Sequence, residues 1–145
     1  MKTLYTARAT STGGRDGSVK TDDGAISSKL TRAGAPGGTN PEQLFAAGYS
    51  ACFTSAVEYI AKQQGQNVAP VTTNIEVHLN QDEATGFSLG VTLDVQLPSL
   101  DKTAAEKLVA AAHQMCPYSK ATRGNIQVTL MANGKPLAAN TAAAA

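Results

Sequence analysis

Hydrophobic and polar residues alternate in the first part of the chain as they do in short strands. The alternation covers residues 3–10, and two further short strands are expected near residues 18–20 and 26–30. Turns rich in glycine and aspartate separate these segments, at residues 13–17 and 22–24. The pattern predicts an N-terminal antiparallel meander of three strands.

Three later segments show the period of two that is typical of half-buried strands. They cover residues 72–80, 87–97 and 126–130. The dipeptide Asn133-Gly134 after the last segment predicts a hairpin turn. These strands are therefore expected to form antiparallel sheets.

A long helix is predicted between the two groups of strands, over residues 41–64. Thr39 or Asn40 is placed to cap it, and a proline follows at the first helical position. Almost no charge occurs between Glu42 and Glu58, whereas a surface helix of that length would carry a polar face. The helix is therefore expected to be buried nearly all round.

A second helix is predicted to begin at a capping box of Thr103 and Glu106 and to end near Pro117. The order of elements indicates an α+β fold, with antiparallel sheets packed around a long buried central helix, rather than a doubly wound parallel sheet. The length of 145 residues fits one domain of ordinary size. We expect this domain at residues 1–137 and an alanine-rich tail at residues 138–145.

Composition and charge disfavour several classes of function. The chain has 12 Lys+Arg and 11 Asp+Glu, which leaves no basic surface for nucleic acid or for an anionic membrane. No run of about 18 apolar residues predicts a membrane span, and the N-terminus lacks the apolar segment of a signal peptide. A cytoplasmic location is therefore expected. No glycine-rich phosphate-binding motif supports nucleotide binding.

Two cysteines are the main candidates for chemistry. Cys52 lies in the middle of the predicted apolar helix and Cys116 at the end of the second helix, 64 positions later. Both could be small buried hydrophobic residues. Burial within a helix raises the pKa of a thiol, so an active Cys52 would need a cation from elsewhere. Arg15, in the glycine-rich turn, is the obvious candidate, although it could equally be a solvated turn residue, and Glu42 could simply favour the start of its helix.

Three motifs resemble the organic hydroperoxide resistance branch of the OsmC/Ohr family. The motifs are NPEQLFAAGYSACF at residues 40–53, CPYSKATRGN at residues 116–125 and GGRDG at residues 13–17. The similarity covers essentially the whole chain up to about Pro136. The resemblance implies an OsmC-like fold that assembles as an intertwined homodimer.

The resemblance also implies an activity, a thiol-dependent peroxidase that reduces organic hydroperoxides in the response to oxidative stress. Cys52 matches the family's peroxidatic cysteine and Cys116 its resolving cysteine, while Arg15 and Glu42 match the pair that activates the thiolate. In the implied cycle, a sulfenic acid on Cys52 condenses with Cys116 to a disulfide. The family implies no bound cofactor, and it implies a dihydrolipoyl group on a lipoylated partner protein as the reductant.

The chemistry of these residue types agrees with the implied roles. An arginine stays protonated, so it can stabilise a thiolate and orient a peroxide oxygen, and a carboxylate can hold it by a bidentate pair. Leu44, Phe45, Phe53 and Met115 would suit an alkyl or lipid hydroperoxide better than hydrogen peroxide, although each could also be plain core.

Helix geometry bears on the assembly. Glu42 and Cys52 are ten positions apart, which places them about 15 Å apart along a straight helix. Either the helix is broken between them, or Glu42 serves the Cys52 of another chain. Because the helix is apolar nearly all round, we expect the second arrangement, a homodimer with its sites at the interface.

Oxidation is expected to affect the arginine turn. Once Cys52 leaves the thiolate state, Arg15 loses its anionic contact. We hypothesise that the turn then swings away in the oxidised enzyme.

Four alternatives to this function are open. A metal site could use His113 and Cys116, which share a helix face, with Cys52 and His78 as further ligands, but no paired ligand spacing occurs and no metal is expected. A cysteine hydrolase would need an oriented histidine base, and neither histidine shows that signature. The remaining two are a non-catalytic module that binds an apolar ligand and a peroxidase that prefers hydrogen peroxide.

Overall fold

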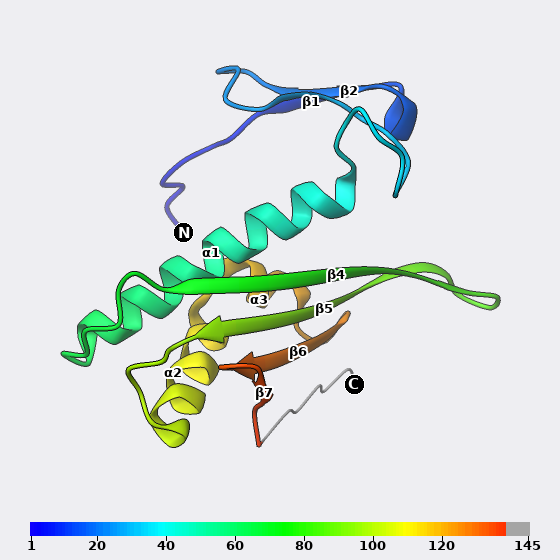
Figure 1. Ribbon diagram of the computed structural model, residues 1–145. Coiled ribbons are helices and arrows are strands. Elements are labelled where there is room, and N and C mark those ends of the chain that lie inside the picture. The colour runs from blue at the N-terminus through cyan, green and yellow to red at the C-terminus, as the bar shows by residue number, and fades with distance from the viewer. Residues whose placement is uncertain (139–145) are drawn as a thin grey trace. The chain divides into compact units, whose positions relative to one another are not determined.

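The computed structural model describes residues 1–138, and these fall into two compact units (Figure 1). The N-terminal unit is Met1–Leu44, and the C-terminal unit begins at Phe45. Each unit is described by itself below, and the single domain expected at residues 1–137 stays a prediction. Beyond its first residue, the predicted alanine-rich tail lies outside the described residues.

The N-terminal unit contains the predicted antiparallel meander. Its strands pair in the order β1-β2-β3, with a single turn of 3-10 helix, η1, between the first two. The elements are β1 (Ala9–Thr12), η1 (Gly14–Asp16), β2 (Ser18–Thr21) and β3 (Ser27–Lys29). The prediction of a strand over residues 3–10 is wrong at its start, because β2 ends at Thr21 and leaves the residues before Ala9 without a partner strand.

The glycine-rich turn is shaped by a close approach of its two ends. A Cβ atom on Gly17 would lie 1.8 Å from the carbonyl oxygen of Thr12, so no other residue fits there without a shift of the backbone. The turn presents the side chain of Arg15 from η1.

Helix α1 (Pro41–Gln63) begins and ends close to the predicted residues. Asn40 caps it, as expected: its Oδ1 accepts a hydrogen bond from the backbone N–H of Gln43 at 2.8 Å. The Oε1 of Gln43 accepts one from the N–H of Asn40 at 3.2 Å, which completes a capping box.

Burial of α1 is confined to one face in the single chain. Its buried residues are Tyr49, Phe53, Ala56, Val57 and Ala61. A stripe of residues spaced four apart is exposed, made of Ala47, Ala51, Ser55 and Tyr59. The expectation of burial nearly all round is therefore met on one side of the helix only.

The sheet of the C-terminal unit is mixed, with strands in the order β4-β5-β6-β7 (Figure 1). The strands are β4 (Thr72–Asp82), β5 (Gly86–Gln96), β6 (Gln127–Ala132) and β7 (Lys135–Pro136). The pairs β4–β5 and β6–β7 are antiparallel, as predicted, but β5–β6 is parallel. The prediction failed there because the chain passes through two helices between β5 and β6, and such a crossover can return it in the same direction. The predicted hairpin turn is present, with φ of 50° at Asn133 and 75° at Gly134.

Two helices connect β5 to β6. Helix α2 (Lys102–Met115) is capped by Asp101, whose side chain accepts from the N–H of Ala104 at 2.9 Å. The predicted cap at Thr103 is wrong, because the helix begins one residue before it. Helix α3 (Pro117–Thr122) follows directly, with the proline in its first turn.

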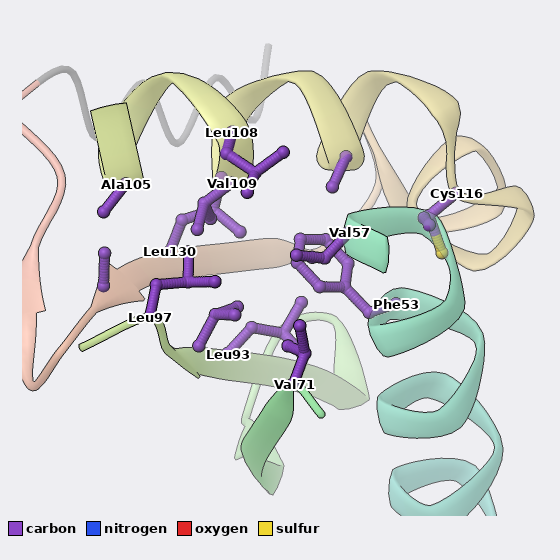
Figure 2. Close-up of a cluster of buried hydrophobic side chains, with 14 of the residues drawn as sticks. Phe53, Val57, Val71, Leu93, Leu97, Ala105, Leu108, Val109, Cys116 and Leu130 are labelled. Atoms are coloured by element: carbon purple, nitrogen blue, oxygen red, sulfur yellow. The ribbon is translucent and has the colours of Figure 1, made fainter. Parts of the chain in front are cut away.

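The core of the C-terminal unit lies where β5, β6, α2 and the buried face of α1 meet (Figure 2). Its residues include Phe53, Val57, Leu93, Leu97, Leu108 and Val109. Each fully buried side chain of this size contributes about 1.5–3 kcal/mol relative to its exposed state. Within residues 1–138, no helix is long and apolar enough to cross a membrane.

Replacement of the α2 cap should separate the observed cap from the predicted one. We expect Asp101→Ala to lower the free energy of unfolding by about 1 kcal/mol, because the N–H of Ala104 loses its acceptor. Thr103→Ala, at an exposed position, should change it by less than about 0.5 kcal/mol. Urea unfolding measures both, and a larger loss in Thr103→Ala would contradict the cap assignment.

Candidate functional site

The N-terminal unit brings Arg15 and Glu42 together as a bidentate ion pair. Arg15 comes from η1 and Glu42 from the first turn of α1. The guanidinium donates from Nη1 to Oε2 at 2.8 Å and from Nη2 to Oε1 at 2.5 Å. The Arg15 side chain is 42% exposed and that of Glu42 only 12%. The carboxylate is thus largely covered, while the arginine keeps access to a further partner.

Each partner stabilises the charged form of the other. The hydrogen bond from Arg15 lowers the pKa of Glu42, although partial burial of the carboxylate acts in the opposite direction. The same hydrogen bond raises the pKa of Arg15. The pair is therefore fully ionised at neutral pH, and Glu42 holds the guanidinium in one orientation.

A second ion pair on the turn was missed from the sequence. Asp16, next to Arg15, accepts from the Nε and Nη2 of Arg32 at 3.3 and 3.2 Å. Both side chains are well exposed, so this pair contributes little to stability. The charge of Asp16 in the turn indicated that it could form an ion pair, but nothing in the sequence indicated Arg32 as its partner.

The C-terminal unit brings Cys52 and Cys116 together. Cys52 lies in α1 and Cys116 at the junction of α2 and α3, and their Sγ atoms are 3.5 Å apart. Both are free thiols; Cys116 is fully buried and Cys52 half-buried. Figure 2 shows Cys116 beside the ribbon of α1, at the edge of the core. Sulfurs this close need only a small movement to form a bond.

The environment of Cys52 within its unit favours the neutral thiol. Burial raises the pKa of Cys52, and the neighbouring Cys116 raises it further, although the backbone N–H of Tyr118 lowers it. Cys52 is therefore protonated at neutral pH unless a cation is brought to it, as the sequence suggested.

A buried polar cluster beside the thiols was also missed from the sequence. The hydroxyl of Tyr49 lies 2.9 Å from Ser119 Oγ and 3.3 Å from Thr122 Oγ1. Tyr49 and Ser119 are fully buried. A signal was available in the spacing, since Tyr49 lies three residues from Cys52 and Ser119 three residues from Cys116.

The four residues suggested for substrate contact differ in burial. Phe53 is fully buried in the core, and Phe45 and Met115 are half-buried and pack against it. Leu44, the last residue of the N-terminal unit, is half-buried. Their contact with a substrate stays a prediction.

The histidines lie apart from any cluster of ligands. Burial, and to a smaller extent Arg123, lowers the pKa of His113, so its imidazole is neutral at pH 7. His78 lies on β4, with Nε2 3.8 Å from a carboxylate oxygen of Glu76. In the part of the chain from residue 1 to 138, no three His, Cys, Asp or Glu side chains are grouped so that they could hold a metal ion.

Known proteins resemble this chain in sequence and in structure. The model of the OsmC-like protein family matches residues 34–131. The organic hydroperoxide resistance protein OhrB of Bacillus subtilis (strain 168) is 48% identical over an alignment of 134 positions, and the match covers 88% of this chain and 96% of that protein. The crystal structure of OhrB of Bacillus subtilis matches with a TM-score of 0.85 and 47% identity, over 90% of this chain and 99% of that chain. A structure from Vibrio cholerae, described as a putative organic hydroperoxide resistance protein with captopril in one of the active sites, has a TM-score of 0.88 and 38% identity, over 94% of this chain and 97% of that one.

Acid should break the Arg15–Glu42 pair. The folded-state pKa of Glu42 is lowered, so the pair's contribution to stability is present above the unfolded value of about 4.3 and is lost as the pH falls through the lower folded value. A double-mutant cycle with Arg15→Gln, Glu42→Gln and both should give a favourable coupling energy at pH 7 that declines to zero at low pH. Urea unfolding from pH 7 to pH 2 measures it, and a coupling that does not change with pH would contradict the ion pair.

Proposed function

Because the chain belongs to the OsmC/Ohr family, we propose that it is a cysteine-based peroxidase that reduces organic hydroperoxides and so takes part in the response to oxidative stress. The observation that carries the proposal is the pair of free thiols, Cys52 and Cys116, whose sulfurs lie 3.5 Å apart. The relatives named organic hydroperoxide resistance proteins support the substrate class. A thiol pair at this distance fits a reaction in which one cysteine is oxidised and the other resolves it.

The first step is the attack of the Cys52 thiolate on the hydroperoxide. Its sulfur bonds to the terminal oxygen as the O–O bond breaks, and the alkoxide leaves and takes up a proton as the alcohol. Cys52 becomes a sulfenic acid, and the peroxide is reduced. Cys52 fits this role because it is the more accessible of the two thiols, whereas Cys116 is fully buried.

Arg15 and Glu42 supply the charge that this step needs. Burial raises the pKa of Cys52, so a cation must stabilise its thiolate. Arg15 is permanently charged and keeps free donors beside its bidentate bond to Glu42, so it can contact both the thiolate and a peroxide oxygen. Helix α1 runs unbroken from Pro41 to Gln63, and Glu42 and Cys52 are therefore about 15 Å apart along it. We infer that the pair serves the Cys52 of a second chain in a homodimer.

The second and third steps reset the enzyme. Cys116 attacks the sulfenic acid of Cys52, and the disulfide forms with loss of water. A dithiol then reduces that disulfide through a mixed disulfide, and is itself oxidised to a cyclic disulfide. A dihydrolipoyl group carried on a partner protein meets this need, since its two thiols lie on one chain. The protein requires no bound cofactor for any of these steps.

The substrate is an alkyl or lipid hydroperoxide rather than hydrogen peroxide. Phe45, Met115 and Cys52 are all half-buried and pack against the core that contains Cys116, so the first two can offer an apolar contact to an alkyl chain. Burial of an alkyl group there is favourable, whereas hydrogen peroxide has no apolar surface to bury.

Peroxidase assays with dihydrolipoamide test the proposal. We expect consumption of cumene hydroperoxide and of a fatty-acid hydroperoxide at a much higher kcat/KM than of hydrogen peroxide. Cys52→Ser should abolish turnover, whereas Cys116→Ser should still react once per chain and then stall. Turnover by Cys52→Ser at the wild-type rate would contradict the mechanism, and a wild-type protein that consumes no hydroperoxide would favour a non-catalytic module that binds apolar ligands.

Mixed dimers test the sharing of sites between chains. Arg15→Ala and Cys52→Ser should each be nearly inactive alone, and a mixture unfolded and refolded together should recover about a quarter of the wild-type activity. Half of the dimers would then be mixed, and each would join one intact Arg15 to one intact Cys52. The control is Arg15→Ala refolded with the double variant Arg15→Ala/Cys52→Ser, which should recover nothing. No recovery in the test mixture would place both residues of a site in one chain.

A further inference from the structure

The segment that contains the buried cysteine is fixed to α1 by a hydroxyl cluster. Tyr49 reaches from α1 to α3, where its Oη lies 2.9 Å from Ser119 Oγ and 3.3 Å from Thr122 Oγ1. Thr122 Oγ1 also lies 3.0 Å from the carbonyl oxygen of Tyr118, within its own helix. The exposed fraction is 0% for Tyr49 and Ser119 and 6% for Thr122, so the cluster is shielded from water.

Packing around this cluster leaves little room for α3 to move. The rings of Tyr49 and Tyr118 are stacked, with centroids 5.5 Å apart and an angle of 24° between their planes. Gly48 lies directly under Tyr118: a Cβ atom at Gly48 would be 2.6 Å from the Tyr118 hydroxyl oxygen. The first turn of α3 is therefore in close contact with α1.

The cluster and the thiol pair lie in matching positions on the two segments. Tyr49 precedes Cys52 by three residues on α1, about one helical turn. Ser119 follows Cys116 by three residues, in the turn that starts α3. The 2.9 Å contact between hydroxyls and the 3.5 Å contact between sulfurs therefore join the same two segments, one turn apart.

Burial alone does not account for the hydroxyl of Tyr49. A phenylalanine would fill the same space without a polar atom that needs a partner, and a buried hydroxyl pair adds little net stability compared with two apolar groups. What a satisfied polar cluster adds is a fixed orientation of the segments that carry it. Burial raises the pKa of Tyr49, so the hydroxyl remains protonated and can donate.

We propose that Tyr49 is a positioning residue for the resolution step, and that its hydroxyl, bonded to Ser119 and Thr122, holds Cys116 within reach of Cys52. The peroxidatic part of this statement rests on the proposed function, whereas the pairing of the two thiols does not. In resolution, the S–S bond forms while the S–O bond of the Cys52 sulfenic acid breaks, and the hydroxyl leaves with the Cys116 proton as water. The sulfur of Cys52 is reduced and that of Cys116 oxidised, so no further reactant is needed.

Position controls the outcome because two reactions compete for the sulfenic acid. A second hydroperoxide oxidises it to a sulfinic acid, which no longer forms a disulfide. The nearby thiol prevents this only if it is already placed for attack, since pre-organisation raises its effective concentration. A looser α3 therefore slows resolution without any change at Cys52 itself.

The equilibrium between the dithiol and the disulfide tests the proposal without any peroxide. Reduced and oxidised forms are quantified by alkylation and mass spectrometry in a series of dithiothreitol redox buffers. In Tyr49→Phe we expect the equilibrium constant for the Cys52–Cys116 disulfide to fall about tenfold, the effect of one lost hydrogen bond in the cluster. An equilibrium constant within about twofold of the wild-type value would overturn the proposal.

Two further variants separate positioning from a general loss of stability. Thr54→Val removes a hydroxyl of α1 whose hydrogen bonds go to Ser50 O at 2.9 Å and to Thr73 Oγ1 on β4 at 2.8 Å, so the disulfide equilibrium should stay within about twofold of wild type. Tyr49→Phe/Ser119→Ala removes both hydroxyls of the main pair, so it should unfold close to the wild-type denaturant concentration. Its equilibrium constant for the Cys52–Cys116 disulfide should nevertheless stay as low as in Tyr49→Phe. If the pairing recovered together with the stability, Tyr49 would be merely structural and the proposal would be overturned.

A single exposure to hydroperoxide tests the effect on the reaction. With one equivalent of cumene hydroperoxide, Tyr49→Phe should lose its Cys52 thiol at the wild-type rate, but dimedone should trap more sulfenic acid on Cys52. Equal slowing of the loss of the Cys52 thiol and of disulfide formation would overturn the positioning role. If the wild-type protein does not react with hydroperoxide, the proposed function fails, and the dithiothreitol equilibrium still decides whether Tyr49 positions Cys116.

Discussion

Contact between α1 and the segment that joins α2 to α3 is the constraint on which the rest of the site depends. Cys52 and Cys116 are 64 positions apart, yet their sulfurs approach to 3.5 Å. One face of α1 accounts for this proximity. Phe53 and Val57 on that face pack into the core with β5 and α2, and Tyr49 forms a hydrogen bond with Ser119 of α3. The same apolar packing that stabilises the C-terminal unit therefore places the thiols.

This packing also makes Cys52 a poor nucleophile when left alone, because burial favours its neutral form. The charge that could reverse this is kept outside the core, in the bidentate pair of Arg15 with Glu42 in the N-terminal unit. A guanidinium in the core would be costly to desolvate, whereas a pair on a turn is formed at little cost. The ion pair and the two thiols therefore belong to different units of the chain, and the proposed function needs them in one site.

Much of the fold could be predicted from the sequence because its signals are local. Asn40 and the proline after it set the start of α1, and the period of two identified β4, β5 and β6. Two errors arose where distant parts of the chain decide, in the parallel pairing of β6 and the short β1, whereas the cap at Asp101 was a local signal that was missed. The roles proposed for the cysteines come from the family motifs, since spacing alone left both as possible core residues. The role of the Tyr49 hydroxyl was missed, because its signal, the three-residue spacing to Cys52, cannot be told from core packing until the partner segment is known.

The unequal exposure of the two cysteines would make a disulfide between them chemically directional. Cys116 is fully buried, whereas Cys52 is partly open to solvent. An incoming thiol can therefore reach the disulfide only at the Cys52 sulfur, and Cys116 must be the leaving group. A mixed disulfide with a small thiol such as glutathione would form on the Cys52 sulfur, and Cys116, still close by, would then expel the small thiol. The fold thus selects which adduct forms and also removes it.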